Sequence, residues 1–240
     1  MAEPSQRPPV ILVHGAANSA AVWRFWQQEL ARLGWRSHAI DLRGHGASPP
    51  ADLSTASMYD YVDDAARAAE QSPTRPIIIG WSMGGLVAMM VAARGLAAAC
   101  VGLAPSLPAQ REDDTVPLRE GVFGPEEYGI VSHDPALQPA MPELDLEERM
   151  VALSSLSAES RRARDERKRG IVIRGLPCPL LIVTGGEDRG WRGPTYARTD
   201  LSAEYLDVED CSHWGLVLNR RALARMVPQV SRWMAQVARA

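Results

Sequence analysis

Short apolar runs alternate with longer amphipathic stretches along most of the chain. Strands are predicted where apolar and β-branched side chains gather, at residues 10–13, 37–40, 77–80, 98–103, 180–183 and 204–208. Between these runs, apolar residues recur at helical spacing over residues 22–33, 58–70, 83–94 and 223–237. Alternating strands and helices are typical of α/β proteins. The pattern therefore predicts a mostly parallel sheet of about six strands with helices on both faces.

The alternation stops between residues 105 and 176. This stretch is rich in proline and charge and has no obvious strand until its end. Two helices are predicted within it, one over residues 158–169 and an earlier one whose apolar face consists of Leu146, Met150, Leu153 and Leu156. We therefore expect an α/β core formed by residues 1–104 and 177–240, with residues 105–176 inserted as a small helical lid.

The charge and the composition exclude several classes of protein. The 240 residues carry a net charge of −3, which argues against a nucleic-acid surface and against strong attraction to anionic membranes. No apolar stretch reaches the length of a membrane span, and residues 1–9 lack the basic start and apolar core of a secretion signal. We expect a cytoplasmic protein whose partner is a small-molecule substrate.

The cysteines do not indicate a disulfide framework or a metal site. Cys100, Cys178 and Cys211 form an odd set in a chain without a secretion signal, which favours reduced thiols. Cys211 and His213 lie close together, but no second ligand pair at metal spacing accompanies them. The sequence therefore predicts neither a metal nor an organic cofactor.

The stretch GWSMGG, residues 80–85, places Ser82 where a predicted strand turns into a predicted helix. Gly80 and Gly84 complete the pattern G-x-S-x-G, in which the flanking residues must be small because the serine backbone is strained. The strain lifts the hydroxyl clear of the backbone, and the helix N-terminus favours negative charge. Ser82 is therefore a candidate nucleophile, and the alternative is a tight turn that merely contains a serine.

Several motifs in a characteristic order extend this hypothesis over nearly the whole chain. They are HGA at residues 14–16, DLRGHGAS at 41–48, GWSMGG at 80–85, GGEDRG at 185–190 and CSHWG at 211–215. Together they resemble the α/β-hydrolase fold superfamily. Nine residues precede the first predicted strand, so we expect the fold to lack the usual opening antiparallel strands. In this respect the chain is similar to the compact subgroup that includes plant methylesterases and hydroxynitrile lyases.

The resemblance implies a catalytic triad of Ser82, Asp188 and His213. A serine hydroxyl needs an imidazole to accept its proton, and the imidazole needs an acid that holds its tautomer. In this fold the chain order is serine, then acid, then histidine, and all three follow strands that end at one edge of the sheet. Glu187 is an adjacent alternative acid, but a neighbour in a turn points elsewhere.

The remaining histidines and acids are less suited to the triad. Asp207 and Asp210 are too close to His213 in sequence to come from a separate loop. For His14, His38, His45 and His133 we favour structural or solvated roles.

The oxyanion hole requires two N–H groups directed at the developing negative charge. The first is expected from Met83, the residue after the nucleophile. The resemblance places the second at Ala16, with Ala17 in reserve. Pocket walls are expected from four aromatic residues, for which an ordinary core or surface position is the alternative: Phe25, Trp81, Trp191 and Trp214.

The predicted activity is that of a serine hydrolase, a carboxylesterase by resemblance, that cleaves a carboxylic ester, a lactone or a related acyl bond through an acyl-enzyme on Ser82. The alternatives are a receptor or regulatory protein that keeps the triad, and a cofactorless lyase or carbon–carbon bond hydrolase on the same fold. A receptor would not turn over a generic ester. A lyase would release an aldehyde without consuming water.

Charge also separates the two parts of the predicted lid. Residues 105–149 contain eleven acidic side chains and three arginines, whereas residues 150–175 contain seven basic and three acidic side chains. Such runs are usually solvated faces. If the acidic part borders the entrance of the pocket, its field would favour neutral over anionic substrates.

Overall fold

Six parallel strands form the central sheet of the computed structural model, which describes residues 7–188, 190–191, 193–196 and 201–238. The strands lie in the order β2-β1-β3-β4-β7-β8, and every pairing is parallel. Their bounds are Val10–Val13 (β1), Ser37–Ile40 (β2), Ile77–Trp81 (β3), Ala99–Leu103 (β4), Leu180–Gly185 (β7) and Glu204–Val208 (β8). The predicted fold class, an α/β protein with a parallel sheet, is confirmed.

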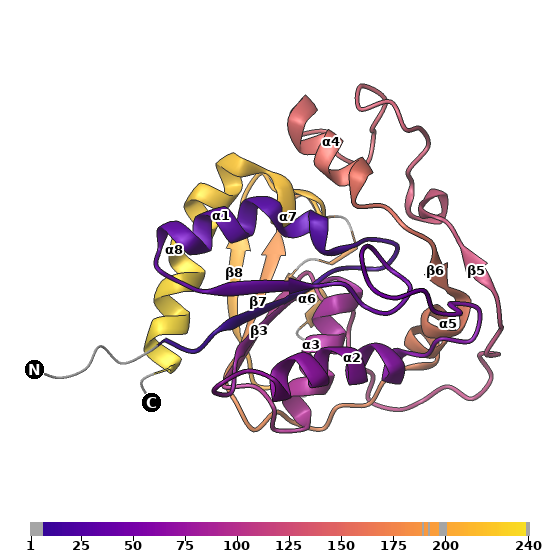
Figure 1. Ribbon diagram of the computed structural model, residues 1–240, viewed down its shortest axis with the longest axis horizontal. Coiled ribbons are helices and arrows are strands. Elements are labelled where there is room, and N and C mark those ends of the chain that lie inside the picture. Colours follow the sequence, from indigo (N-terminus) through magenta and orange to yellow (C-terminus); the bar gives the residue numbers. More distant parts are fainter. Residues whose placement is uncertain (1–6, 189, 192, 197–200, 239–240) are drawn as a thin grey trace, which may run out of the picture.

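Helices cover both faces of this sheet (Figure 1). One face packs against α1 (Arg24–Arg32), the preceding 3-10 turn η1 (Ala20–Trp23), α7 (Gly215–Leu218) and α8 (Arg220–Val237). The other face packs against α2 (Met58–Glu70) and α3 (Met83–Ala93), and α6 (Gly193–Tyr196) adds a buried tyrosine there. The two helix layers enclose two separate hydrophobic cores, one on each side of the sheet.

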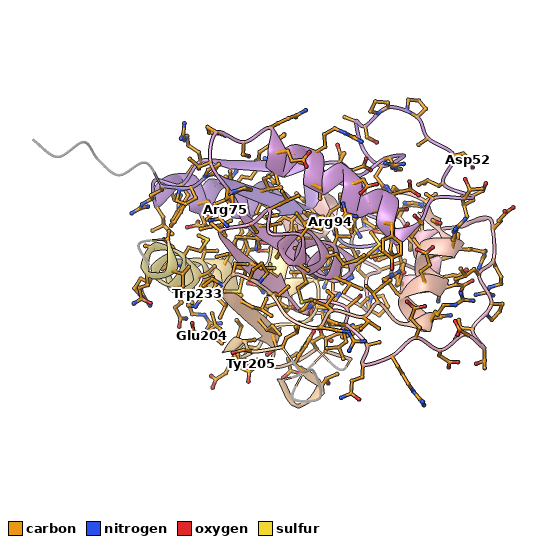
Figure 2. The ribbon with its side chains drawn as sticks, turned by 90° about the horizontal axis from the view of Figure 1, so that it is seen from below. Asp52, Arg75, Arg94, Glu204, Tyr205 and Trp233 are labelled. Atoms are coloured by element: carbon orange, nitrogen blue, oxygen red, sulfur yellow. The ribbon has the colours of Figure 1, made fainter. Side chains whose placement is uncertain are left out.

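The burial of each strand follows its place in the sheet. The inner strands β1, β3, β4 and β7 are buried along their whole length, which explains their continuous apolar runs. The edge strand β8 is largely exposed. Trp233 of α8 donates a hydrogen bond to Glu204 of β8 at 2.7 Å, with the two side chains side by side in Figure 2. This bond attaches the last helix to the edge of the sheet.

Residues 105–176 run along one side of the sheet and contain little regular structure (Figure 1). Their elements are β5 (Val122–Phe123), the 3-10 turn η2 (Pro125–Tyr128), α4 (Leu146–Ser154), β6 (Glu159–Ser160) and α5 (Arg161–Arg169). β5 and β6 pair antiparallel. Two-residue strands are too short to leave an alternating pattern in the sequence, so this small sheet was not predicted.

Helix α4 forms where expected, but only part of the expected apolar face is covered. Leu146 and Met150 are 58% and 49% exposed, whereas Val151 and Ala152 are buried. A capping box between Asp145 and Glu148 starts the helix, and Glu148 also accepts a hydrogen bond from the backbone of α8. The apolar spacing identified the helix and part of its packed face, because Leu153 and Leu156 are partly buried against the core while Leu146 and Met150 are exposed.

No helix among the described residues combines the length and apolar character required to cross a lipid bilayer.

Candidate active site

Ser82 lies at the sharp turn between β3 and α3, with φ 54° and ψ −119°. This is a strained conformation for a residue with a side chain. A Cβ atom on Gly80 would overlap the carbonyl oxygen of Gly84, and one on Gly84 would overlap the carbonyl oxygens of Val13 and His14. Glycine is therefore required at both flanks, and the turn presents the Ser82 side chain in front of the helix N-terminus.

The loops after β7 and β8 bring a carboxylate and an imidazole together. Nδ1 of His213 lies 2.6 Å from Oδ2 of Asp188. The other carboxylate oxygen accepts hydrogen bonds from the amides of Gly190 at 3.0 Å and Trp191 at 3.1 Å. Burial alone would raise the pKa of Asp188, but its interactions with His213 and these amides outweigh burial and lower the pKa. Asp188 is thus held ionised beside the ring.

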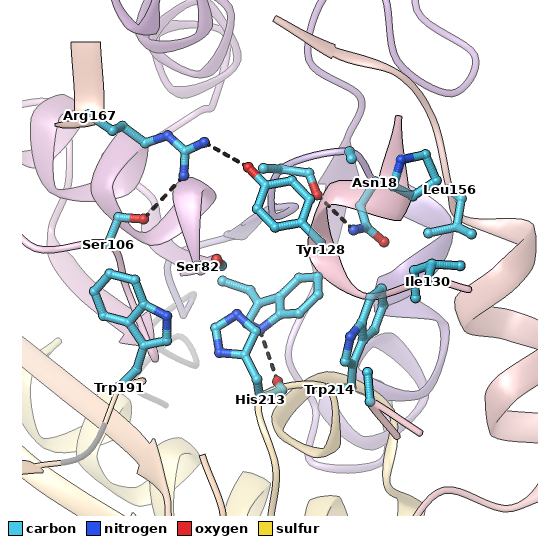
Figure 3. Close-up of a pocket in the computed structure, with 15 residues that line it drawn as sticks. Asn18, Ser82, Ser106, Tyr128, Ile130, Leu156, Arg167, Trp191, His213 and Trp214 are labelled. Atoms are coloured by element: carbon cyan, nitrogen blue, oxygen red, sulfur yellow. Dashed lines mark hydrogen bonds between the residues drawn. The ribbon is translucent and has the colours of Figure 1, made fainter. Parts of the chain in front are cut away.

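Ser82 and His213 line one cavity of about 270 Å³ (Figure 3). Because Nδ1 of His213 is bound to Asp188, Nε2 is the ring nitrogen left for proton transfer. Trp81 lies against this ring at a centroid distance of 5.2 Å, and its Nε1 donates to the His213 carbonyl at 3.0 Å. Trp191 and Trp214 line the same cavity. The cavity thus brings together a hydroxyl and an imidazole that is bound to a carboxylate, the types of group that acyl transfer uses.

Phe25 lies away from this cavity. It is 3% exposed on α1, packed within the core beside α8, and the guanidinium of Arg220 lies 5.3 Å from its ring centroid. Phe25 therefore does not line the pocket as expected, because the side of α1 that carries Phe25 faces the core.

Two amides near Ser82 are candidates for binding an oxyanion. Met83 is the first residue of α3, so its N–H has no acceptor within the helix. The amide of Ala16 donates to no acceptor among the described residues. The amide of Ala17, in contrast, donates to the Glu159 carboxylate at 3.1 Å. The reserve candidate is therefore occupied, and Ala16 is the available donor in the loop after β1.

Side chains from residues 105–176 hold this loop in place. Asn18 donates to the carbonyl of Ala16 at 2.9 Å, and its own side-chain oxygen accepts a hydrogen bond from Ser155 at 2.7 Å. Glu159 holds the next amide, that of Ala17. The loop that carries the candidate oxyanion donor is thus held at Asn18 by Ser155 and at Ala17 by Glu159.

The other histidines lie outside the cavity. His14 is fully buried, and its Nε2 accepts from the amide of Leu42 at 3.2 Å while Nδ1 contacts the carbonyl of Gly15 at 2.9 Å. Burial and the charge of His45 lower the pKa of His14 to about 4. His38 and His133 are exposed and do not line the cavity. These positions agree with bracing or solvated roles.

The cavity also contains polar residues that the sequence analysis did not select: Asn18, Ser106, Tyr128 and Arg167. Ser106 offered a signal, because it follows β4 at the same edge of the sheet as Ser82. Arg167 belongs to a run of basic residues that resembled a solvated face, and Tyr128 lies in an irregular segment. Neither had a motif that would have identified it.

Within the described part of the chain, no three His, Cys, Asp or Glu side chains gather in a way that would hold a metal ion.

Comparison with known proteins places the chain among proteins of similar architecture. Residues 10–226 match the model of the alpha/beta hydrolase family. A pimeloyl-[acyl-carrier protein] methyl ester esterase from Yersinia pseudotuberculosis is 30% identical over 183 residues, which are 74% of this chain and 64% of that protein. One from Vibrio vulnificus is 39% identical over 87 residues, 36% of this chain and 32% of that protein. The chain thus spans about a third to two thirds of the length of these curated relatives.

Solved structures show the same fold at lower sequence identity. Polyneuridine aldehyde esterase superposes with a TM-score of 0.73 at 15% identity, covering 94% of this chain and all of that one. A methylesterase from Arabidopsis gives 0.68 at 18% identity, covering 93% and 99% of the two chains. The family match extends over most of the sequence, and the fold agrees with it. The chain belongs to the alpha/beta hydrolase family.

Proposed function

We propose that the protein is a serine esterase that cleaves a small carboxylic ester through an acyl-enzyme on Ser82. The observation that carries this proposal is the set of groups in one cavity. The imidazole of His213 is bound to Asp188 at 2.6 Å and shares the cavity with the strained Ser82. The relatives named as methyl ester esterases support the reaction class.

In the proposed mechanism, the Ser82 hydroxyl attacks the ester carbonyl while Nε2 of His213 accepts its proton. The amides of Ala16 and Met83 bind the oxyanion of the tetrahedral intermediate, and each such donor lowers the barrier by about 3–4 kcal/mol. The intermediate collapses to the acyl-enzyme, and His213 returns the proton to the departing alcohol. Water activated by the same imidazole then releases the acid, while Asp188 stabilises the imidazolium at both steps.

The dimensions of the cavity favour a small substrate. A volume of about 270 Å³ is at the lower end of typical ligand sites. A methyl ester, the substrate type in the names of the relatives, has a small leaving group that suits such a space. We propose a cytoplasmic location, because Cys100, Cys178 and Cys211 are all free thiols.

The test is covalent labelling together with turnover. Wild-type protein should gain one fluorophosphonate adduct per chain and hydrolyse a generic p-nitrophenyl ester. The variant Ser82→Ala should do neither, yet it should keep its circular dichroism spectrum, because the side chain serves as nucleophile and not as core packing. Equal labelling of the variant would rule out Ser82 as the nucleophile.

The same experiment separates the alternatives. A receptor on this fold would bind a small molecule without releasing an alcohol, and a lyase would release an aldehyde without consuming water. Release of one acid and one alcohol per water consumed, dependent on Ser82, is the result expected for the esterase.

A further inference from the structure

One arginine of α5 differs from its neighbours in what it contacts. The helix carries six basic residues: Arg161, Arg162, Arg164, Arg167, Lys168 and Arg169. Arg161 and Arg164 form ion pairs with Glu127, and Arg162 pairs with Glu166. Arg167 has no carboxylate within ion-pair distance among the described residues, and it lines the cavity that contains Ser82.

The guanidinium of Arg167 is held by two hydroxyl groups. It donates to Oγ of Ser106 at 3.5 Å and to the Tyr128 hydroxyl at 3.1 Å (Figure 3). Its Nε is buried and has no acceptor among the described residues. A guanidinium has five N–H donors, so these two neutral acceptors leave most of its capacity unused. Leaving a buried donor of a charged group unpaired costs free energy, which an anionic ligand would recover.

Glu159 is a carboxylate that the charge of Arg167 influences, but its oxygens are already engaged by other groups. Its carboxylate accepts hydrogen bonds from the Tyr61 hydroxyl at 2.6 Å and from the Ala17 amide at 3.1 Å. The charge of Arg167 contributes to the lowered pKa of Glu159 only through space. The positive charge of Arg167 therefore remains available to the cavity.

The position of Arg167 relative to the nucleophile is set by Ser106. The Ser106 amide donates to the carbonyl of Ser82 at 2.8 Å, while its hydroxyl accepts from Arg167. A single residue thus links the guanidinium to the nucleophile. Another part of the cavity wall is apolar and is formed by Ile130, Leu156 and Trp214. Figure 3 shows these three on one side of Ser82 and Arg167 with Ser106 on the other.

We propose that Arg167 is a specificity-determining residue that binds a carboxylate carried by the ester substrate. This rests on the proposed function, because it assigns a substrate class to the same site. A planar guanidinium with free donors matches a carboxylate in two parallel hydrogen bonds. Binding of a carboxylate by Arg167 would make the enzyme prefer anionic esters. This is the opposite of the preference for neutral esters expected from the acidic residues of the predicted lid. None of the described residues that line the cavity is Asp or Glu, so those acids do not border the bound substrate.

The test compares matched esters that differ by one carboxylate. One series uses methyl half-esters of four- to seven-carbon dicarboxylic acids against methyl esters of monocarboxylic acids of equal length. The other places the carboxylate on the alcohol, as in O-acetylglycolate against ethyl acetate. In at least one series, wild-type kcat/KM should favour the carboxylate-bearing ester by about ten- to a hundred-fold, the range of one charge-assisted hydrogen-bonded pair.

Two variants on the same helix make the test specific. Arg167→Gln should bring that ratio close to one, chiefly by raising KM for the carboxylate ester. Arg162→Gln removes the same charge from an arginine that is paired outside the cavity, and it should preserve the ratio. The preference should also persist at high salt, because a buried contact is screened much less than a surface field.

Three results would overturn the proposal. These are no preference in either series, an equal loss on both esters in Arg167→Gln, and loss of the preference in Arg162→Gln. Calorimetric titration of a half-ester into Ser82→Ala and into the double variant Ser82→Ala, Arg167→Gln measures the affinity that this contact contributes without turnover. If wild-type protein hydrolyses no ester, the proposed function fails, while the affinity difference between these two proteins still decides the role of Arg167.

Discussion

Two carboxylate–histidine pairs in this molecule have nearly the same chemistry and opposite surroundings. In the first, Asp188 and His213 are 2.6 Å apart and the histidine side chain is 25% exposed. In the second, Glu159 and His45 are 3.5 Å apart and both side chains are fully buried. The first pair lies at the cavity with Ser82, whereas the second lies behind the loop that follows β1.

The difference lies in which ring nitrogen remains free. Nδ1 of His213 is bound to Asp188, which leaves Nε2 on a ring that lines the cavity. In His45, Nδ1 contacts the carbonyl of Arg43 at 2.9 Å and Nε2 faces Glu159. A histidine with both nitrogens directed at protein groups, and no access to solvent, cannot exchange protons with a substrate. A carboxylate beside an imidazole therefore indicates catalysis only where the second nitrogen reaches a cavity.

The sealed pair acts on the site through the backbone. Burial alone would raise the pKa of Glu159, but its interactions with His45 and Tyr61 outweigh burial and lower the pKa to about 2. The ionised carboxylate then accepts the Ala17 amide at 3.1 Å. We infer that the buried pair keeps the Ala16 amide in position, while the accessible pair moves the proton.

The largest expected effect comes from the accessible pair. Asp188→Asn should lower kcat by about 10³- to 10⁴-fold, because the amide favours the wrong imidazole tautomer. Steady-state kinetics on a p-nitrophenyl ester measure the loss, and the melting temperature checks that the fold is retained. Asp210→Asn, in the loop before His213, is the matched control and should change kcat little. A reversed order of the two effects would assign the acid to the other loop.

Breaking the sealed pair should affect stability more than chemistry. Glu159→Gln should cost about 3 kcal/mol of folding free energy, because it removes one partner of a buried ion pair. For a protein of this size the melting temperature should fall by about 6–12 °C, measurable by calorimetry. The loss in kcat at low temperature should stay below the roughly hundred- to thousand-fold cost of losing an oxyanion donor. A larger loss in kcat with an unchanged melting temperature would contradict the comparison.

The smallest and most diagnostic effect is that the loss of folding free energy in Glu159→Gln should depend on pH. The pKa of Glu159 is lowered from 4.5, so its contribution to stability is present above about pH 4.5 and is lost as the pH falls towards 2. Burial lowers the pKa of His45, but the interaction with Glu159 prevails and raises it above 6.5. The contribution of His45 is therefore complete below pH 6.5 and is lost as the pH rises through its pKa in the folded protein.

The stability difference between wild type and Glu159→Gln should consequently be largest between about pH 4.5 and 6.5 and smaller on either side. Urea unfolding across this range measures it. A difference that stays constant with pH would show that Glu159 and His45 are not coupled through charge.

The elements around Ser82 could be predicted because their causes are local. β-branched residues favour the strand at 77–81, and only glycine fits beside Ser82 at positions 80 and 84. The proximity of Ser82, Asp188 and His213 followed from the family order together with one topological rule. The carboxyl ends of parallel strands meet at a single edge of the sheet.

Other features depended on contacts between distant parts of the chain. The resemblance placed the second oxyanion donor at Ala16 with Ala17 in reserve, and Glu159, 142 residues beyond Ala17, occupies the Ala17 amide. The apolar spacing of α4 was compatible with several rotations of the helix. The one observed buries Val151 and Ala152 while Glu148 bonds to α8.

The sequence by itself thus determined the order of the elements, the turn at Ser82 and the set of groups available for acyl transfer. Only the tertiary structure decided which of the six basic residues of α5 faces the cavity. Along the sequence these six differ little, because a charge run indicates solubility and not direction. The packing of α5 against the residues that follow β4 and against η2 brings Arg167 to Ser106 and Tyr128. The remaining arginines pair with Glu127 or Glu166 or, in the case of Arg169, donate to the Val116 carbonyl.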